Sequence, residues 1–181
     1  SGFQTALGYL ARESKSPNAT TEALAREMPS GIGYRVLDEL AFSSTKKMSG
    51  IKIKRLVGGY NIVLGAPEFV AKIAKLSPDA KQRLDELNAQ GLRTLLLASL
   101  PMEASFADLD KKTKPQAQPI ALVTLKNYLR DGVVETIEYL QSNGITLKVI
   151  SGDNPATVSF IAKQAGIARF DQTITGEEFE K

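Results

Sequence analysis

A hydroxyl, a glycine and a carboxylate stand side by side at Ser151-Gly152-Asp153, and this turn is the strongest candidate for chemistry in the sequence. The apolar run from Thr146 to Ile150 favours a strand before it, and Asn154-Pro155 favours the start of a helix after it. The free N–H groups and the dipole of a helix N-terminus attract an anion. The spacing therefore predicts either a phosphate-binding turn or an ordinary strand-to-helix loop.

Composition limits which groups could act at such a turn. The 181 residues include no histidine and no cysteine, which excludes an imidazole base, thiolate chemistry and disulfides. No apolar run reaches the roughly 18 residues that a membrane span needs. The net charge of +3 is mild and the basic residues are spread out, so we expect no nucleic-acid partner, while a small anion such as a nucleotide remains possible.

The expected secondary structure changes character near residue 118. Before it, two helices should precede antiparallel strands, with a hairpin at the Gly58-Gly59 pair and a buried strand over 93–100. The polar stretch 102–119 is predicted to be a loop or mobile linker. After it, the pattern predicts a parallel βαβα unit: strand 120–125, helix 131–143, strand 146–150, a helix from Pro155, and a further short strand over 173–175.

Three other positions have residue types that suit a nucleotide. Phe42 could stack on a purine with Lys47 adding charge, although a core phenylalanine and a solvated lysine are the commoner explanation. Gly65, in Gly-Ala-Pro-Glu, could let a ligand lie against the backbone or could simply mark a strand-to-helix junction. Arg93 could bind a phosphate bidentately or reach into solvent at the start of its strand.

The segment Asp108-Leu109-Asp110 looks like the paired aspartates of phosphoryl-transfer enzymes. Such a nucleophile should follow a buried strand directly, whereas the strand before this segment ends at Pro101. One alternative therefore stays open, a stand-alone haloacid-dehalogenase-like phosphatase that uses Asp108 or Asp110. Non-catalytic binding modules, with or without nucleotide, are further alternatives.

Taken in order along the chain, short motifs resemble those of cation-transporting P-type ATPases, and most closely the bacterial ones. They cover nearly the whole sequence: Phe-Ser-x-x-x-Lys at 42–47, Gly-Ala-Pro-Glu at 65–68, Gly-Leu-Arg at 91–93, Leu-Arg at 129–130 and Lys-Val-Ile-Ser-Gly-Asp at 148–153.

This resemblance implies an α/β protein of two parts. Residues 1–118 resemble the nucleotide-binding domain, an antiparallel sheet flanked by helices, and residues 119–181 resemble part of the Rossmann-like, haloacid-dehalogenase-type phosphorylation domain. By the same resemblance, Phe42 stacks on adenine, Lys47 lies beside the base, and Arg93 reaches the phosphates. Gly65 and Arg130 are assigned to the nucleotide site as well. The Ser151-Gly152-Asp153 turn contacts the transferred phosphoryl group.

The sequence also departs from the family pattern at several points. The family's phosphorylated aspartate motif and its later magnesium-binding motif are not found. Leu64 stands where the family usually has a lysine, and Asn127 stands where it usually has an aspartate. We therefore expect a soluble cytoplasmic piece of a pump in the bacterial cell membrane that binds ATP or ADP without turning it over. Its cofactors are ATP and Mg²⁺, with no metal ligand among the site residues. Its partners are the membrane helices, the actuator domain and the remainder of the phosphorylation domain.

Overall fold

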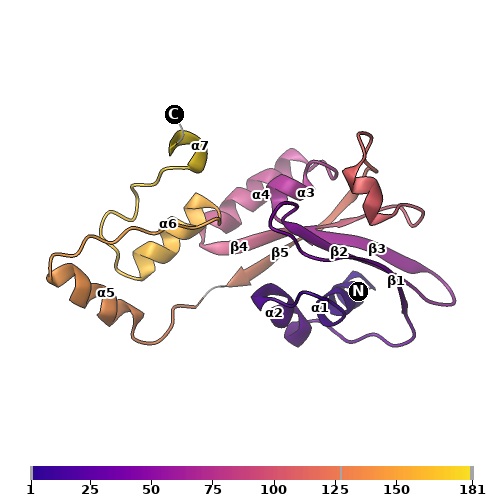
Figure 1. Ribbon diagram of the computed structural model, residues 1–181, viewed down its shortest axis with the longest axis horizontal. Helices are drawn as coiled ribbons and strands as arrows, with labels where there is room; N and C mark the ends of the chain where they lie inside the picture. Colours follow the sequence, from indigo (N-terminus) through magenta and orange to yellow (C-terminus); the bar gives the residue numbers. More distant parts are fainter. Residues whose placement is uncertain (1, 127, 180–181) are drawn as a thin grey trace. The chain divides into compact units, whose positions relative to one another are not determined.

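The computed structural model describes residues 2–126 and 128–179, drawn in Figure 1. Its elements follow one another as α1 (Gly2–Arg12), α2 (Ala19–Glu27), β1 (Arg35–Leu40), β2 (Met48–Lys54), β3 (Gly59–Gly65), α3 (Pro67–Val70), α4 (Pro78–Ala89), β4 (Leu92–Ser99), η1 (Phe106–Asp110), β5 (Gln118–Lys126), α5 (Val133–Ser142), α6 (Pro155–Gln164) and α7 (Gly176–Phe179). None of the helices in the described residues is both long and apolar enough to cross a membrane.

The five strands form one sheet in the order β1-β2-β3-β4-β5. The pairings β1–β2, β2–β3 and β3–β4 are antiparallel, with Ile51 opposite Ile62 and Ile62 opposite Ser99. The predicted hairpin is present, and Arg55 N donates to Gly58 O at 3.1 Å across its turn. The expected antiparallel sheet flanked by helices is thus confirmed. The assignment of strand 120–125 to a separate parallel βαβα unit is wrong for this structure, because the strand joins this sheet as β5, beside β4.

Chain contacts divide the protein into two compact units. The first consists of Ser1–Ser77 and Leu95–Val123, and the second of Pro78–Thr94 and Thr124–Lys181. The division at about residue 118 into a nucleotide-binding and a phosphorylation domain remains a prediction.

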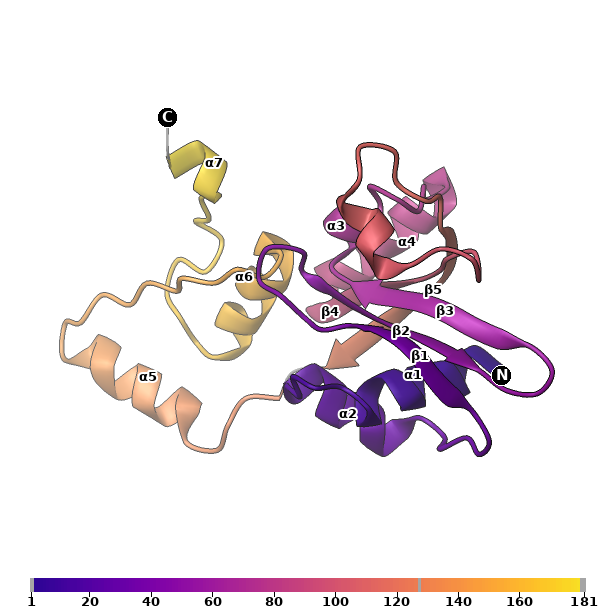
Figure 2. The same ribbon diagram turned by 45° about the vertical axis from the view of Figure 1, so that its right-hand side comes forward.

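The core of the first unit lies in the central strands and under the first two helices. The most deeply buried side chains lie on β2, β3 and β4, and they include Ile51, Ile53, Ile62, Leu96 and Leu97. In β3 and β4 the buried residues form continuous runs. Helices α1 and α2 cover one face of β1–β3 in both views of the ribbon (Figures 1 and 2). This arrangement fits the amphipathic pattern of α1, whose apolar positions face inward. Asn18 caps α2, because its Oδ1 accepts from the N–H groups of Thr20 and Thr21.

The prediction that residues 102–119 form a mobile linker is wrong, because this segment packs onto the sheet. Phe106 and Leu109 of η1 are buried. Asn61, buried in β3, donates from Nδ2 to Pro101 O at 2.8 Å and to Ala104 O at 3.0 Å. Two apolar side chains and one buried amide are enough to anchor a segment whose overall composition is polar.

In the second unit, α4 and α6 pack against each other. Gly91 ends α4 with a left-handed φ of 73°, and a Cβ there would lie 2.0 Å from the ring of Phe160 in α6. Glycine is therefore required at this position by its backbone angle and by the close approach of the ring. The predicted start of α6 is confirmed, with Asn154 as its N-cap and Pro155 as its first residue.

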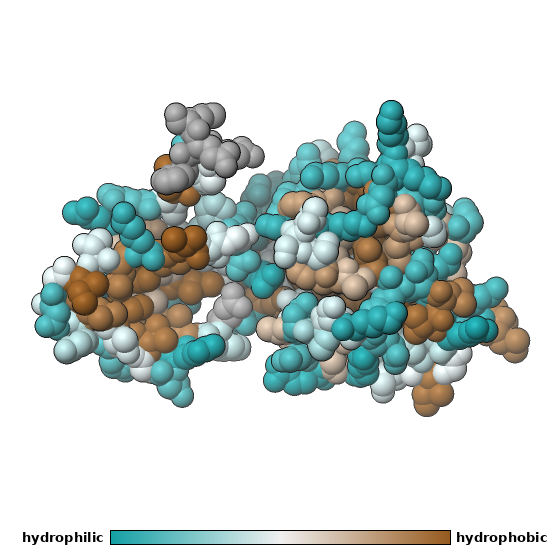
Figure 3. Space-filling model, viewed as in Figure 1, coloured by the Kyte–Doolittle hydropathy of each residue, from teal (hydrophilic) through white to brown (hydrophobic). Residues whose placement is uncertain are grey.

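The strands expected over 146–150 and 173–175 are wrong for this structure, because both segments lack regular secondary structure. Ile150 is 98% exposed and Val149 is 50% exposed. Figure 3 shows hydrophobic surface gathered over α5 and the segment that follows it, and α5 has no buried residue. An apolar strand needs neighbours that pair its backbone groups and cover its faces. In the part of the chain that the structure describes, no strand of the sheet pairs with 146–150.

Candidate phosphate and nucleotide sites

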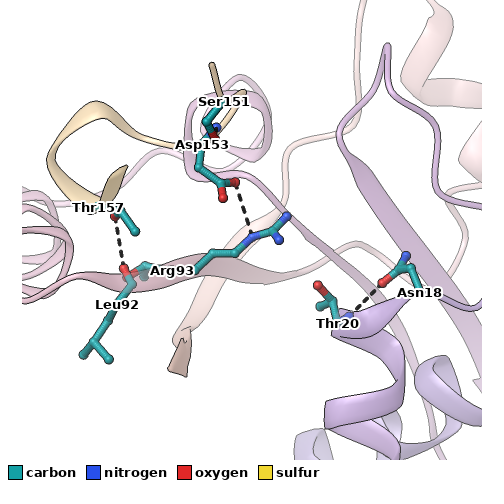
Figure 4. A network of polar contacts seen from close by, with 8 residues as sticks. Asn18, Thr20, Leu92, Arg93, Ser151, Asp153 and Thr157 are labelled. Atoms are coloured by element: carbon teal, nitrogen blue, oxygen red, sulfur yellow. Dashed lines mark hydrogen bonds and ion pairs between the residues drawn. The ribbon is translucent and has the colours of Figure 1, made fainter. Parts of the chain in front are cut away.

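In the second unit, the structure joins Arg93 to the Ser151-Gly152-Asp153 turn. Arg93 is the second residue of β4, and its Nε lies 3.7 Å from Oδ1 of Asp153 (Figure 4). The two side chains are 42% and 37% exposed, so solvent and ligands can reach the pair. The sequence motifs predicted each residue separately, but not that they would form an ion pair.

A buried hydroxyl group fixes the same corner of the second unit. Thr157 in the first turn of α6 is 1% exposed, and its Oγ1 donates to the carbonyl oxygen of Leu92 at 3.4 Å (Figure 4). This bond ties the N-terminal turn of α6 to the residue just before Arg93. Sequence reasoning missed Thr157, since a threonine in a first helical turn has many other uses.

Hydrogen bonds within the turn organise the residues that precede α6. Ser151 Oγ accepts from the N–H of Asp153 at 3.1 Å, and Asn154 Oδ1 accepts from the N–H of Ala156 at 2.9 Å. Ser151 and Gly152 are exposed. A guanidinium group, an exposed hydroxyl group and a helix N-terminus thus lie at one corner, a combination that suits phosphoryl oxygens.

Arg130 lies apart from this turn in the sequence, in the segment between β5 and α5. Its side chain is exposed, and its carbonyl oxygen accepts from the N–H of Val133 at 3.2 Å. Its assignment to a nucleotide site stays a prediction. Asn127, the departure from the family motif, lies outside the described residues.

In the first unit, Phe42 and Lys47 flank the turn between β1 and β2. The ring of Phe42 is 42% exposed. Lys47 adopts a left-handed φ of 46°, donates its N–H to Ser43 O at 2.8 Å, and accepts from the N–H of Ala66 at 2.9 Å. This strained residue is therefore tied directly to the strand end that contains Gly65. Its Nζ lies 5.5 Å from the ring centre of Phe69.

Gly65 has a packing role that needs no ligand. A Cβ at this position would lie 2.4 Å from Cβ of Met48 and 2.5 Å from the carbonyl oxygen of Lys47. The glycine therefore allows β2 and β3 to approach closely, and its contact with a nucleotide stays a prediction. Leu64, where the family pattern has a lysine, is 3% exposed and belongs to the core.

The paired aspartates of η1 have structural partners. Asp108 accepts from the N–H of Ser105 at 2.8 Å and pairs with Lys111 at 2.6 Å, while Asp110 pairs with Lys46 at 2.8 Å. The Lys111 ammonium group, and then the Ser105 amide, hold the pKa of Asp108 below its usual range. Neither aspartate follows the end of a strand, which argues against the phosphatase alternative.

The residues at these sites do not provide a magnesium site by themselves. Among the described residues, no group of three or more acidic, histidine or cysteine side chains lies close enough to hold a metal ion. Asp153 is the one carboxylate of its turn and is already paired with Arg93.

Comparison with known proteins agrees with the motifs. Residues 100–181 match the family model of haloacid dehalogenase-like hydrolases. The chain is 34% identical, over 90% of its length, to a probable cation-transporting ATPase, exp7, of Streptococcus pneumoniae, and 34% identical, over 89%, to the calcium-transporting ATPase CtpE of Mycobacterium tuberculosis. It is 30% identical, over 76% of its length, to the plasma membrane-type calcium-transporting ATPase 2 of Arabidopsis thaliana.

The chain spans 19% of the length of the two bacterial relatives and 15% of the plant protein. The order of the motifs and the sequence identity lead to the same family. Over most of its length the chain is a relative of the cation-transporting P-type ATPases, with a haloacid dehalogenase-like segment at residues 100–181.

Proposed function

We propose that this chain is the ATP-binding part of a cation pump, and that its first unit binds ATP or ADP through Phe42 and Lys47. The observation that carries the proposal is the exposed ring of Phe42 beside the strained turn at Lys47. Large aromatic side chains are usually buried, so an exposed aromatic residue in the same turn as a lysine suits a purine that carries phosphates. The similarity to cation-transporting ATPases over 90% of the chain supports the same ligand.

In the second unit, the proposed contacts to the phosphoryl group come from Arg93, Ser151 and Gly152, with Asp153 orienting the guanidinium group. Arg130 and Gly65 complete the set of proposed nucleotide contacts. An anion that approaches Arg93 competes with the Asp153 carboxylate, because both need the same guanidinium N–H groups. The turn is then a phosphate sensor whose ion pair opens when a phosphoryl group arrives.

The chain by itself binds nucleotide without hydrolysing it. Phosphoryl transfer depends on positioning and on charge neutralisation by metal ions. In residues 2–126 and 128–179, no aspartate directly follows the carboxyl end of a strand, and no metal-binding cluster is present. We propose that hydrolysis and cation movement belong to the complete membrane pump, with this part on the cytoplasmic side. The exposed apolar segment 146–150 would pack against the remainder of the phosphorylation domain.

Equilibrium dialysis with labelled ATP tests nucleotide binding. Phe42→Ala should weaken binding about tenfold or more, since stacking on an aromatic ring is worth roughly 1–3 kcal/mol. Tyr139→Ala is the matched control, because Tyr139 is an exposed aromatic residue of α5. Equal affinity of the Phe42→Ala variant and the control would contradict the proposal. Hydrolysis of a phosphate ester that Asp110→Asn abolishes would instead support the phosphatase alternative.

A further inference from the structure

A separate cavity in the first unit has the character of an anion site. It has a volume of about 150 Å³ and lies between α3 with the turn after it, the start of β2, and η1. Elements α3 and η1 lie on the side of the sheet opposite to α1 and α2 (Figure 2). Apolar atoms of Phe69, Ile73 and Leu109 line the cavity together with the lysines Lys46, Lys72 and Lys114.

The charge of this cavity is strongly unbalanced. Three lysines and a single acid, Asp110, are among the lining residues, which gives a net charge of +2 (3 − 1). One of these lysines is held against the wall of the cavity, since Nζ of Lys72 lies 4.5 Å from the ring centre of Phe69. Ammonium groups that line one cavity repel each other, and a bound anion would relieve that repulsion.

Asp110 occupies part of the cavity as an internal anion. Its Oδ2 lies 2.8 Å from Nζ of Lys46, and the two side chains are 64% and 33% exposed. Because this is a partly exposed pair, it contributes little stability and can be exchanged for another anion at low cost. A ligand with two negative charges would make stronger contacts to the lysines than one carboxylate does.

We propose that this cavity binds a small phosphate group, with Lys46, Lys72 and Lys114 around the oxygens and Phe69 beneath them. The volume suits inorganic phosphate or pyrophosphate, and it is too small for a drug-sized ligand, which needs roughly 300 Å³ or more. Binding displaces Asp110 from Lys46 and so loosens the link between η1 and the turn before β2. The proposal is independent of the nucleotide contact at Phe42.

Amide chemical shifts of the whole chain, titrated with sodium phosphate against sodium chloride of equal ionic strength, test the proposal. We expect saturable shifts at Lys46, Lys72 and Lys114 with phosphate but not with chloride. The double variant Lys72→Gln with Lys114→Gln should weaken binding by about tenfold or more, because each lysine supplies a charge-assisted hydrogen bond. Lys54→Gln with Lys81→Gln removes the same charge from exposed positions and is the control. Non-saturating shifts, or an equal loss in the control, would overturn the proposal.

Asp110→Asn gives the sharpest result, since it removes the competing carboxylate without removing a lysine. Phosphate affinity should rise several-fold in this variant. A fall in affinity would contradict the proposed exchange. The titration is repeated with pyrophosphate and with ATP, and the phosphate titration is repeated with the Phe42→Ala variant. If the phosphate-induced shifts at the cavity persist in Phe42→Ala, the cavity is separate from the nucleotide site. If they are lost in Phe42→Ala, the two are a single shared site and the proposal is overturned.

Discussion

The Nε atom of Arg93 lies 3.7 Å from Oδ1 of Asp153, which joins the beginning of β4 to the turn before α6. Two motifs far apart in the sequence thus meet in one ion pair. Both side chains are partly exposed, so the pair is open to exchange with a phosphate and does not act as a rigid strut. A phosphoryl group would find the arginine already positioned beside the helix N-terminus.

This ion pair should contribute little to stability. In a double-mutant cycle with Arg93→Gln and Asp153→Asn, measured by urea unfolding, we predict a coupling energy of about 1 kcal/mol or less. Salt at about 0.5 M should lower the coupling energy further, because exposed charges are screened. A coupling of about 3 kcal/mol that salt leaves unchanged would show a buried structural pair and contradict this description.

Asn61 should be far more important for stability than its polar side chain suggests. It is 1% exposed, and its amide holds the carbonyl oxygens of Pro101 and Ala104. We predict that Asn61→Ala lowers the free energy of unfolding by about 1–3 kcal/mol, because a buried side chain and both of its hydrogen bonds to the segment after β4 are lost. Asn143→Ala, at an exposed position after α5, should change stability by less than about 1 kcal/mol. Similar values for the two variants would show that the amide does not anchor this segment.

Gly65→Ala should destabilise the sheet by about 1–3 kcal/mol, since the added methyl group would overlap Cα and Cβ of Met48 and the carbonyl oxygen of Lys47. Gly176→Ala is the control, because a Cβ there would lie in open space. Thermal unfolding distinguishes the two. If Gly65→Ala keeps its stability but loses ATP binding, the glycine serves a ligand and not strand packing.

Acid should remove the stabilising contribution of Asp108. The hydrogen bonds from Lys111 and from the Ser105 N–H lower the pKa of this carboxyl group below its ordinary value of 3.8. The folded state then binds fewer protons than the unfolded state, so the contribution is present above the unfolded pKa and is lost as pH falls through the folded pKa. Urea midpoints of Asp108→Asn, measured from about pH 6 down to pH 2, should fall less steeply than those of the unchanged chain. If the urea midpoints of Asp108→Asn fall as steeply with pH as those of the unchanged chain, the Asp108 carboxylate has no such role.

Much of the first unit could be predicted from sequence because its signals are local. Alternation of Ile51 and Ile53 with lysines indicates a half-covered strand, and Gly58-Gly59 indicates a tight hairpin turn. The segment 102–117 could not be predicted in the same way. The fixed position of this segment depends on hydrogen bonds from Asn61, a residue of a strand distant in the sequence. No local pattern reveals that an asparagine in a strand is buried.

The second unit shows the opposite difficulty. The caps of α6 are local signals, and they were predicted correctly at Asn154 and Pro155. The strand at 146–150 was not, because strand formation depends on a neighbour, and apolar composition alone does not provide one. In the candidate site, the motifs predicted Arg93 and Asp153, while Thr157 and Phe69 were missed. Phe69 stands three residues before Lys72, a spacing that places both on one face of a helical turn and could have indicated their contact.

The central claim, that an adenine nucleotide binds at Phe42 and Lys47, is tested most directly by amide chemical shifts during titration with ATP and, separately, with tripolyphosphate. We predict that millimolar ATP shifts the amides of Phe42, Lys47 and Arg93 in a saturable way, and that tripolyphosphate leaves Phe42 unchanged because it has no base to stack. If ATP at millimolar concentration produces no shifts at Phe42 and Arg93, or if both ligands shift Phe42 equally, the chain does not recognise adenine through this ring.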